Sequence, residues 1–199
     1  MSVKNFTLIT HFWEIMIIYK CNNKIHFKGA IYMFVKWLRE NQIAAGLLTV
    51  IRLYLGYSWL TAGYGKITNG FDASGFLQGA VAKASGDHPA VQGWWASFLE
   101  GVAVPNAGLF TFLVAWGEFL VGLGLILGCL TTAAAFFGII MNFAFLFSGT
   151  VSTNAQMVLL TIFILVAGYN AGKFGLDRYV IPFINKKTNG KLTTRDTVA

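Results

Sequence analysis

Long apolar stretches separated by short polar turns dominate the chain between residues 43 and 172. A helix that crosses a bilayer needs about 20 mostly apolar residues, and about 17 at the least. Four stretches meet or approach this length, namely residues 43–64, 107–127, 130–148 and 156–172. Only "GCLT" and "GTVSTNA" separate the last three of them. The pattern predicts an all-α integral membrane protein, built as a bundle of four transmembrane helices.

The first and second stretches are joined by a long connection, residues 66–106. Its two halves, "FDASGFLQGAVAKASG" and "HPAVQGWWASFLEGVAVP", carry apolar residues at helical spacing. We expect the second half to lie as a short amphipathic helix on the outer membrane surface, with Trp94 and Trp95 in the interfacial belt. The connection is therefore predicted to be extracytoplasmic and partly helical.

The net charge of +7 is concentrated at the two ends of the chain. Residues 1–42 and residues 173–199 each hold six Lys or Arg against two acidic residues, whereas the middle holds three against four. Basic segments that flank apolar helices are typical of cytoplasmic loops. We expect a multi-pass protein of the cell membrane with both termini in the cytoplasm. Nucleic acid is not an expected partner, because no basic stripe with interleaved aromatic residues is present.

The chain divides into three parts. Residues 1–32 contain an apolar stretch, "FTLITHFWEIMIIY", that Glu14 interrupts. This segment fits either an interfacial helix or an extension that precedes a start at Met33. Residues 33–184 form the membrane domain with its four predicted spans. Residues 185–199 are a polar tail on the cytoplasmic side.

Three polar side chains fall inside the predicted spans. At 1.5 Å per residue, Arg52 and Glu118 lie ~13 Å from the cytoplasmic ends of their helices and Asn142 lies ~18 Å from its own. A lone charge at this depth is costly, so the two charged groups are expected to meet. The sequence predicts an Arg52–Glu118 ion pair between antiparallel helices, with Asn142 bonded to the remaining donors.

The first span presents one stripe of residues at helical spacing, namely Arg52, Gly56, Trp59, Gly63 and Lys66. Small residues beside polar ones allow two membrane helices to approach closely, so we expect this stripe to face the bundle interior. Two interpretations of the buried charges stay open. They fix the register of the helices without any ligand, or they mark a path for a ligand, an ion or a proton.

Metal and haem ligands are not evident in the sequence. His11, His26 and His88 all lie outside the predicted spans, and Cys21 and Cys129 form no CxxC pair. Any redox chemistry is therefore expected to run through a bound quinone, another bound cofactor or a partner protein.

Four segments carry a family resemblance: "RLYLGYSWLTAGYGKI", "FDASGFL", "WGEFLVGLGLILG" and "NAGKFGLDRYVIP". Together they resemble the DoxX family of four-helix membrane proteins over residues 43–184, and most closely its DoxD branch. The pattern consists of an Arg-containing first helix that ends in Gly-x-Gly-Lys, a Gly-Glu in the second helix, and Gly-Leu-Asp after the fourth. Residues 1–32 fall outside it.

The resemblance implies the membrane subunit of a thiosulfate:quinone oxidoreductase, which joins two thiosulfates into tetrathionate and reduces a quinone. It also implies a second oxidoreductase subunit as a partner, and a bundle of this size is a candidate to form a homo-oligomer. Two alternatives remain: a non-catalytic scaffold that recruits a soluble redox partner, and a small anion or proton-coupled carrier.

The candidate site residues follow from depth, helix face and the resemblance. Arg52 and Glu118 are the candidate catalytic pair, with Glu118 taking a proton as quinone is reduced. The candidate substrate-binding groups, which an anion would meet on its way in from outside, are Lys66, Arg52 and Asn142. The candidate quinone-binding residues are Tyr57, Trp59 and Tyr64.

Overall fold

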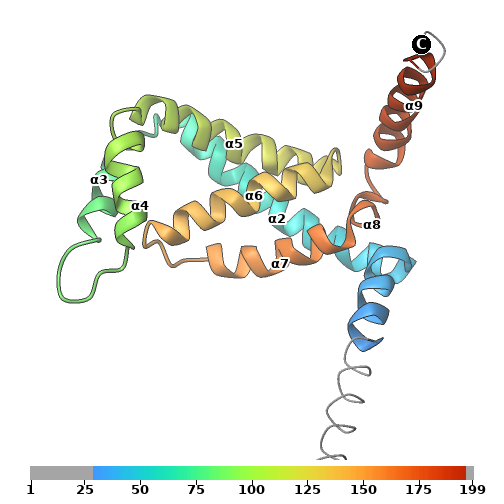
Figure 1. The fold of residues 1–199 in the computed structure, drawn as a ribbon, viewed down its shortest axis with the longest axis horizontal. Helices are drawn as coiled ribbons and strands as arrows, with labels where there is room; N and C mark the ends of the chain where they lie inside the picture. Colours follow the sequence, from blue (N-terminus) through green and yellow to red (C-terminus); the bar gives the residue numbers. More distant parts are fainter. Residues whose placement is uncertain (1–28, 196–199) are drawn as a thin grey trace, which may run out of the picture.

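Four long helices packed side by side form the body of the protein (Figure 1). The computed structural model describes residues 29–195, and every regular element in that part is a helix. The bundle consists of α2 (Gln42–Thr68), α5 (Ala107–Leu127), α6 (Thr131–Phe147) and α7 (Asn154–Ala167). The predicted all-α class is confirmed, and each of the four predicted stretches overlaps one of these helices. The expectations for residues 1–28 lie outside the described residues.

Two of these helices, α2 and α5, are long and apolar enough to cross a membrane. The other two are apolar but shorter, with 17 residues in α6 and 14 in α7. The prediction of a single fourth helix to residue 172 is wrong. Gly168 adopts a positive φ of 57° and ends α7, and the short helix α8 (Tyr169–Gly172) follows in a new direction.

Polar residues lie inside the bundle and large apolar residues lie outside. The buried polar side chains include Arg52, Glu118, Asn142 and Thr161. The bundle's outer surface carries more than a dozen exposed Leu, Ile, Val and Phe side chains. A soluble protein rarely exposes so much apolar surface, whereas lipid favours it. The distribution is that of a membrane protein, whose intramembrane charges turn inward.

Glycines bring α2 and α5 into close contact, as their stripe in the sequence predicts. A Cβ atom at Gly63 would collide with the backbone of Phe119, and one at Gly122 would collide with the backbone of Leu60. These contacts fix the antiparallel pair in one register, in which Gly56 lies beside Ile126 near the C-terminal end of α5.

The long connection folds over one end of the bundle as a helical cap, residues 69–106. It contains α3 (Ser74–Ala82), α4 (Gly93–Phe98) and the π-helical turn η1 (Leu99–Ala103), which share a small apolar core. Just before α3, the Asp72 carboxylate accepts hydrogen bonds from the Ser74 backbone N–H at 3.0 Å and from the Ser74 hydroxyl at 2.8 Å. These bonds lower the pKa of Asp72, the backbone N–H contributing most.

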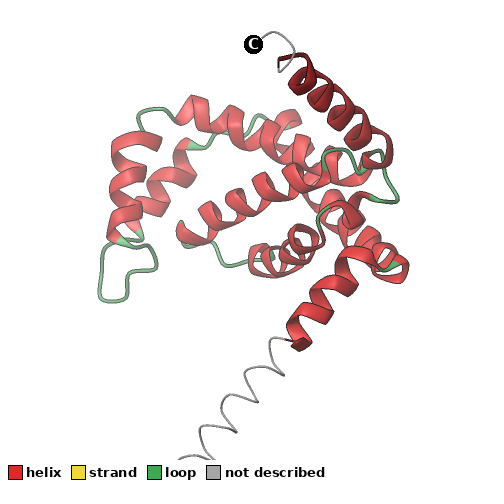
Figure 2. Cartoon of the chain, turned by 45° about the vertical axis from the view of Figure 1, so that its right-hand side comes forward, coloured by secondary structure: helices red, strands yellow, loops and turns green. Residues whose placement is uncertain are grey.

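Both ends of the described chain leave from the opposite end of the bundle, which we call the terminal end. A helix at residues 29–40 leads into α2, and α9 (Asp177–Arg195) follows α8. Figures 1 and 2 show α9 projecting from the bundle and running across its long direction. The Asn170 side chain ties this end together by donating to the backbone oxygens of Leu38 and Asn41.

Candidate functional site

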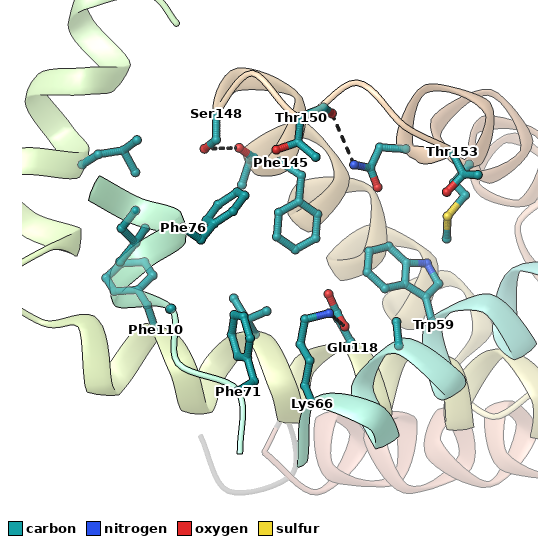
Figure 3. A pocket seen from close by; sticks show the side chains of 18 of the residues that line it. Trp59, Lys66, Phe71, Phe76, Phe110, Glu118, Phe145, Ser148, Thr150 and Thr153 are labelled. Atoms are coloured by element: carbon teal, nitrogen blue, oxygen red, sulfur yellow. Dashed lines mark hydrogen bonds and ion pairs between the residues drawn. The ribbon is translucent and has the colours of Figure 1, made fainter. Parts of the chain in front are cut away.

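A cavity of about 360 Å³ lies between the cap and the bundle (Figure 3). Side chains from α2, α5, α6 and α7 form its bundle side, and α3, α4 and η1 close it from the cap. The helical cap that the sequence predicted as an outer surface element therefore forms one wall of an internal site.

An ion pair lies on the bundle side of this cavity. Lys66 Nζ on α2 donates to Glu118 Oε2 on α5 at 2.6 Å, and Glu118 is only 2% exposed. Lys66 Nζ also lies 5.5 Å from the ring centre of Phe71. The predicted pairing of Glu118 with Arg52 is wrong, because the register of α2 against α5 brings the carboxylate beside Lys66.

Aromatic rings form the walls around the ion pair. Phe76 from the cap and Phe145 from α6 meet edge to face at 6.0 Å between ring centres. Trp95 also lines the cavity, and its Nε1 donates to Ser148 Oγ at 3.0 Å. Trp95 is thus a wall residue of the cavity, whereas its neighbour Trp94 is exposed. The walls suit a flat apolar ligand.

Hydroxyl and amide groups lie across the cavity from the ion pair. Figure 3 shows Ser148, Thr150 and Thr153 at the turn between α6 and α7, opposite Lys66 and Glu118. The buried Thr150 hydroxyl has no hydrogen-bond partner in residues 29–195. A ligand that spans the cavity would therefore meet a charged pair at one side and hydroxyl groups at the other.

Trp59 and Asn142 contribute further buried polar atoms. Trp59, one of the predicted quinone-binding residues, lines the cavity. Its Nε1 has no hydrogen-bond partner among the described residues. Asn142 is fully buried, and neither its amide nitrogen nor its amide oxygen is hydrogen-bonded within the described chain. The sequence predicted that Asn142 would accept hydrogen bonds from Arg52, and this prediction is wrong. Asn142 also does not line the cavity.

Arg52 lies at the terminal end, beside the turn between α5 and α6. Its guanidinium stands against Gly128 and Gly175, where a Cβ atom on either glycine would collide with it. Its Nη2 lies 3.4 Å from the backbone oxygen of Phe174. The predicted shared layer of Arg52 and Glu118 is therefore wrong, and Arg52 does not line the cavity that Lys66 and Glu118 line.

Asp177 fixes the same end of the bundle. Its two carboxylate oxygens accept the backbone N–H groups of Leu130 at 2.6 Å and Thr131 at 2.9 Å. These are free N–H groups at the start of α6, so the carboxylate caps that helix. Asp177 thus caps a helix whose first residue, Thr131, lies 46 residues earlier in the chain.

The two tyrosines predicted to bind quinone point away from the cavity. Tyr57 is 66% exposed and Tyr64 is 60% exposed, both on the outer face of α2. In the described part of the chain, no three His, Cys, Asp or Glu side chains gather into a group that could hold a metal ion.

The cavity walls contain residues that the sequence did not mark as candidate site residues. Phe71, Phe76 and Trp95 come from the connection, and Phe145 comes from α6. The signal available was the clustering of aromatic residues in a segment read as surface. Their convergence depends on how the cap folds back, which no local pattern encodes.

Comparison with known proteins gives one match. The sequence model of a family described as DoxX matches residues 47–151. This range runs from α2 through α6 and holds most of the cavity lining, including Lys66 and Glu118. No curated protein and no solved structure matches the chain.

Proposed function

Because this chain belongs to the DoxX family of membrane proteins, we propose that its cavity binds a quinone and that the chain is the membrane subunit of a quinone-linked oxidoreductase. The electron donor in this proposal is thiosulfate or a related sulfur compound. The observation that carries the proposal is the Lys66–Glu118 pair set in an aromatic cavity.

The chemistry of a quinone matches the groups around the cavity. A quinone ring is flat and apolar and carries two carbonyl oxygens on opposite sides. Phe76 and Phe145 provide ring contacts, while Lys66 donates to one carbonyl and the Thr150 hydroxyl donates to the other. The site offers both kinds of contact within one volume of about 360 Å³.

Reduction of the quinone needs two electrons and two protons. Two thiosulfates each give up one electron and join through a new S–S bond to form tetrathionate. The quinone takes both electrons, and its two oxygens are protonated to give the quinol. The Lys66 ammonium gives a proton to the nearer quinone oxygen, and the Glu118 carboxylate relays a proton from water that restores the ammonium. The second quinone oxygen takes its proton from water.

The proposed topology has α2, α5, α6 and α7 crossing the cell membrane with both termini in the cytoplasm. The excess of basic residues at both ends of the chain supports this orientation. The cap would then face outward, and thiosulfate would be oxidised there on a second subunit that delivers electrons to the quinone.

The proposal is tested in native membranes, where any partner is present. Thiosulfate-dependent reduction of a quinone analogue is measured in the wild type, a deletion strain, and strains carrying Glu118→Gln or Tyr57→Phe. We expect no activity in the deletion, a loss of about 10²-fold in Glu118→Gln, and a Tyr57→Phe rate within about twofold of the wild type.

Equal rates in the wild type and the deletion strain would contradict the proposal. Copurification of a soluble oxidoreductase that does not depend on Glu118 would then favour a scaffold. Anion or proton flux in liposomes without an electron acceptor would favour a carrier.

A further inference from the structure

A second groove, of about 580 Å³, lies at the terminal end, far from the cavity under the cap. It is formed by the start of α6, the end of α7, and the helices α8 and α9. We propose that this groove binds an anionic phospholipid of the leaflet that faces the terminal end.

The deeper part of the groove is apolar. Phe136 and Phe137 lie about 8 Å further along α6 from the terminal end than Thr131 does, at 1.5 Å per residue. The other apolar lining residues are Leu130, Ala133, Leu165 and Ile181. Both Phe side chains are exposed, so they face acyl chains in a bilayer.

Hydroxyl groups form the next layer toward the terminal end. Thr131 and Thr132 begin α6, and Tyr169 begins α8. The Thr131 side chain is fully buried and lines the groove, yet its hydroxyl has no hydrogen-bond partner in the described chain. A buried unpaired hydroxyl is unfavourable, which points to an acceptor supplied by a ligand. The ester carbonyls of a phospholipid lie at this level, just inside the headgroups.

Basic residues follow and flank the lining residues of α8 and α9 in the sequence, although none of them lines the groove itself. Lys173 follows α8, Arg178 lies in the first turn of α9, and Lys186 and Lys187 follow on the same helix. The one acidic group in the groove, Asp177, is held by two backbone N–H bonds at the start of α6. Clusters of Lys and Arg beside a membrane segment bind anionic headgroups through their phosphates. Charge complementarity therefore favours an anionic over a zwitterionic lipid.

The groove thus offers a phospholipid an apolar lining and an unpaired hydroxyl, with basic residues on the adjoining parts of the chain. The aromatic residues of α9 add to this fit, because Tyr179 and Phe183 are exposed on a helix that runs across the bundle axis. Such a helix lies flat at the interface, with aromatic side chains in the headgroup region.

The test uses the full chain purified in detergent, with thermal unfolding followed by tryptophan fluorescence. Phosphatidylglycerol and phosphatidylcholine of identical acyl chains are added in turn. We expect phosphatidylglycerol to raise the unfolding temperature by several degrees more than phosphatidylcholine does. The variant Arg178→Gln and the groove-filling variant Ala133→Phe should each abolish this difference. Lys83→Gln, which removes a basic residue at the cap, should leave it intact.

Thr131→Val gives an independent readout. Loss of the unpaired hydroxyl should raise the unfolding temperature without lipid and reduce the gain from phosphatidylglycerol. Equal effects of both lipids on the wild type, or a full phosphatidylglycerol effect in Arg178→Gln and Ala133→Phe, would overturn the proposal. Glu118→Gln should keep the lipid effect, so failure of the quinone proposal leaves this test unaffected.

Discussion

Lys66 and Glu118 meet at 2.6 Å although 52 residues separate them in the chain. The contact depends on the register of α2 against α5. Gly63 and Gly122 fix this register, because a side chain at either position would collide with the backbone of the facing helix. The same register places an ionised pair in a cavity with aromatic walls. The site is therefore a product of how two helices pack, rather than of any local motif.

The ion pair should respond unequally to removal of its two partners. Lys66→Met leaves the buried Glu118 carboxylate unpaired, which costs about 3 kcal/mol. Glu118→Gln leaves a lysine that is 26% exposed and can turn to water, so its cost is about 1 kcal/mol. One kcal/mol shifts the unfolding temperature by roughly 2–4 °C, so thermal unfolding distinguishes Lys66→Met from Glu118→Gln. The double variant should be more stable than Lys66→Met alone; a double variant with the summed loss would contradict a direct interaction.

The cavity should lose its ligand when it is filled. Ala144 lines it on α6, and Ala144→Phe places a ring in the space that a quinone would occupy. We expect the affinity for a short-chain quinone analogue, measured by tryptophan quenching, to fall by about tenfold or more. Ile140→Phe is the matched control, since Ile140 is exposed one turn earlier on the same helix. Equal losses in both variants would show that binding occurs outside the cavity.

Arg52 should matter for stability and not for quinone affinity. Arg52→Gln removes a buried guanidinium packed between Gly128 and Gly175, and Gly175→Ala pushes a methyl group into it. We expect each change to cost about 1–3 kcal/mol in the free energy of unfolding. Affinity for the quinone analogue should stay within about twofold of the wild type, because the cavity lies at the other end. A loss of affinity for the quinone analogue in Arg52→Gln, with the free energy of unfolding unchanged, would contradict this prediction and show that Arg52 acts in quinone binding.

The start of α3 should weaken in acid. The pKa of Asp72 is lowered in the folded protein by the Ser74 backbone N–H and then by the Ser74 hydroxyl. A lowered folded-state pKa adds stability that is present above the unfolded-state pKa and is lost as pH falls through the folded-state pKa. Ser74→Ala should raise the Asp72 pKa, as carbon-detected NMR titration would show. Amide exchange in α3 should then accelerate at a higher pH than in the wild type; an unchanged titration would contradict this account.

The helices could be predicted from the sequence because apolar length and turn residues are local signals. α5 begins and ends where the pattern of apolar residues does, at Ala107 and Leu127. The inward stripe of α2 was equally readable, since small and polar residues at helical spacing mark a close helix contact.

The ion pair could not be predicted from depth alone. Counting from the helix ends assumed that residues 43 and 127 lie level, but Gly56 stands beside Ile126. α2 extends beyond α5 at the terminal end, where it packs on α8, and Asn170 of α8 donates to Leu38 and Asn41 just before α2. At 1.5 Å per residue, this offset shifts Arg52 by roughly 18 Å along the bundle relative to the level expected for it. Lys66 instead of Arg52 therefore lies at the level of Glu118.

The cap aromatics escaped prediction for a related reason. Trp95 and Phe76 sit in a segment whose composition equally suits a membrane surface, and only tertiary packing turns them onto α6. Exposed and inward-facing aromatic residues look alike in a short helix that lacks a strong polar face. Trp94 and Trp95, adjacent in sequence, show both outcomes.

Photoaffinity labelling tests the central claim most directly. The full chain in native membranes is irradiated with an azido-quinone, and the labelled peptides are mapped by mass spectrometry with and without excess unmodified quinone. The account predicts competed labels on cavity residues such as Phe76, Trp95 and Phe145. Labels confined to the outward-facing Tyr57 and Tyr64, or labels that excess quinone does not remove, would contradict it.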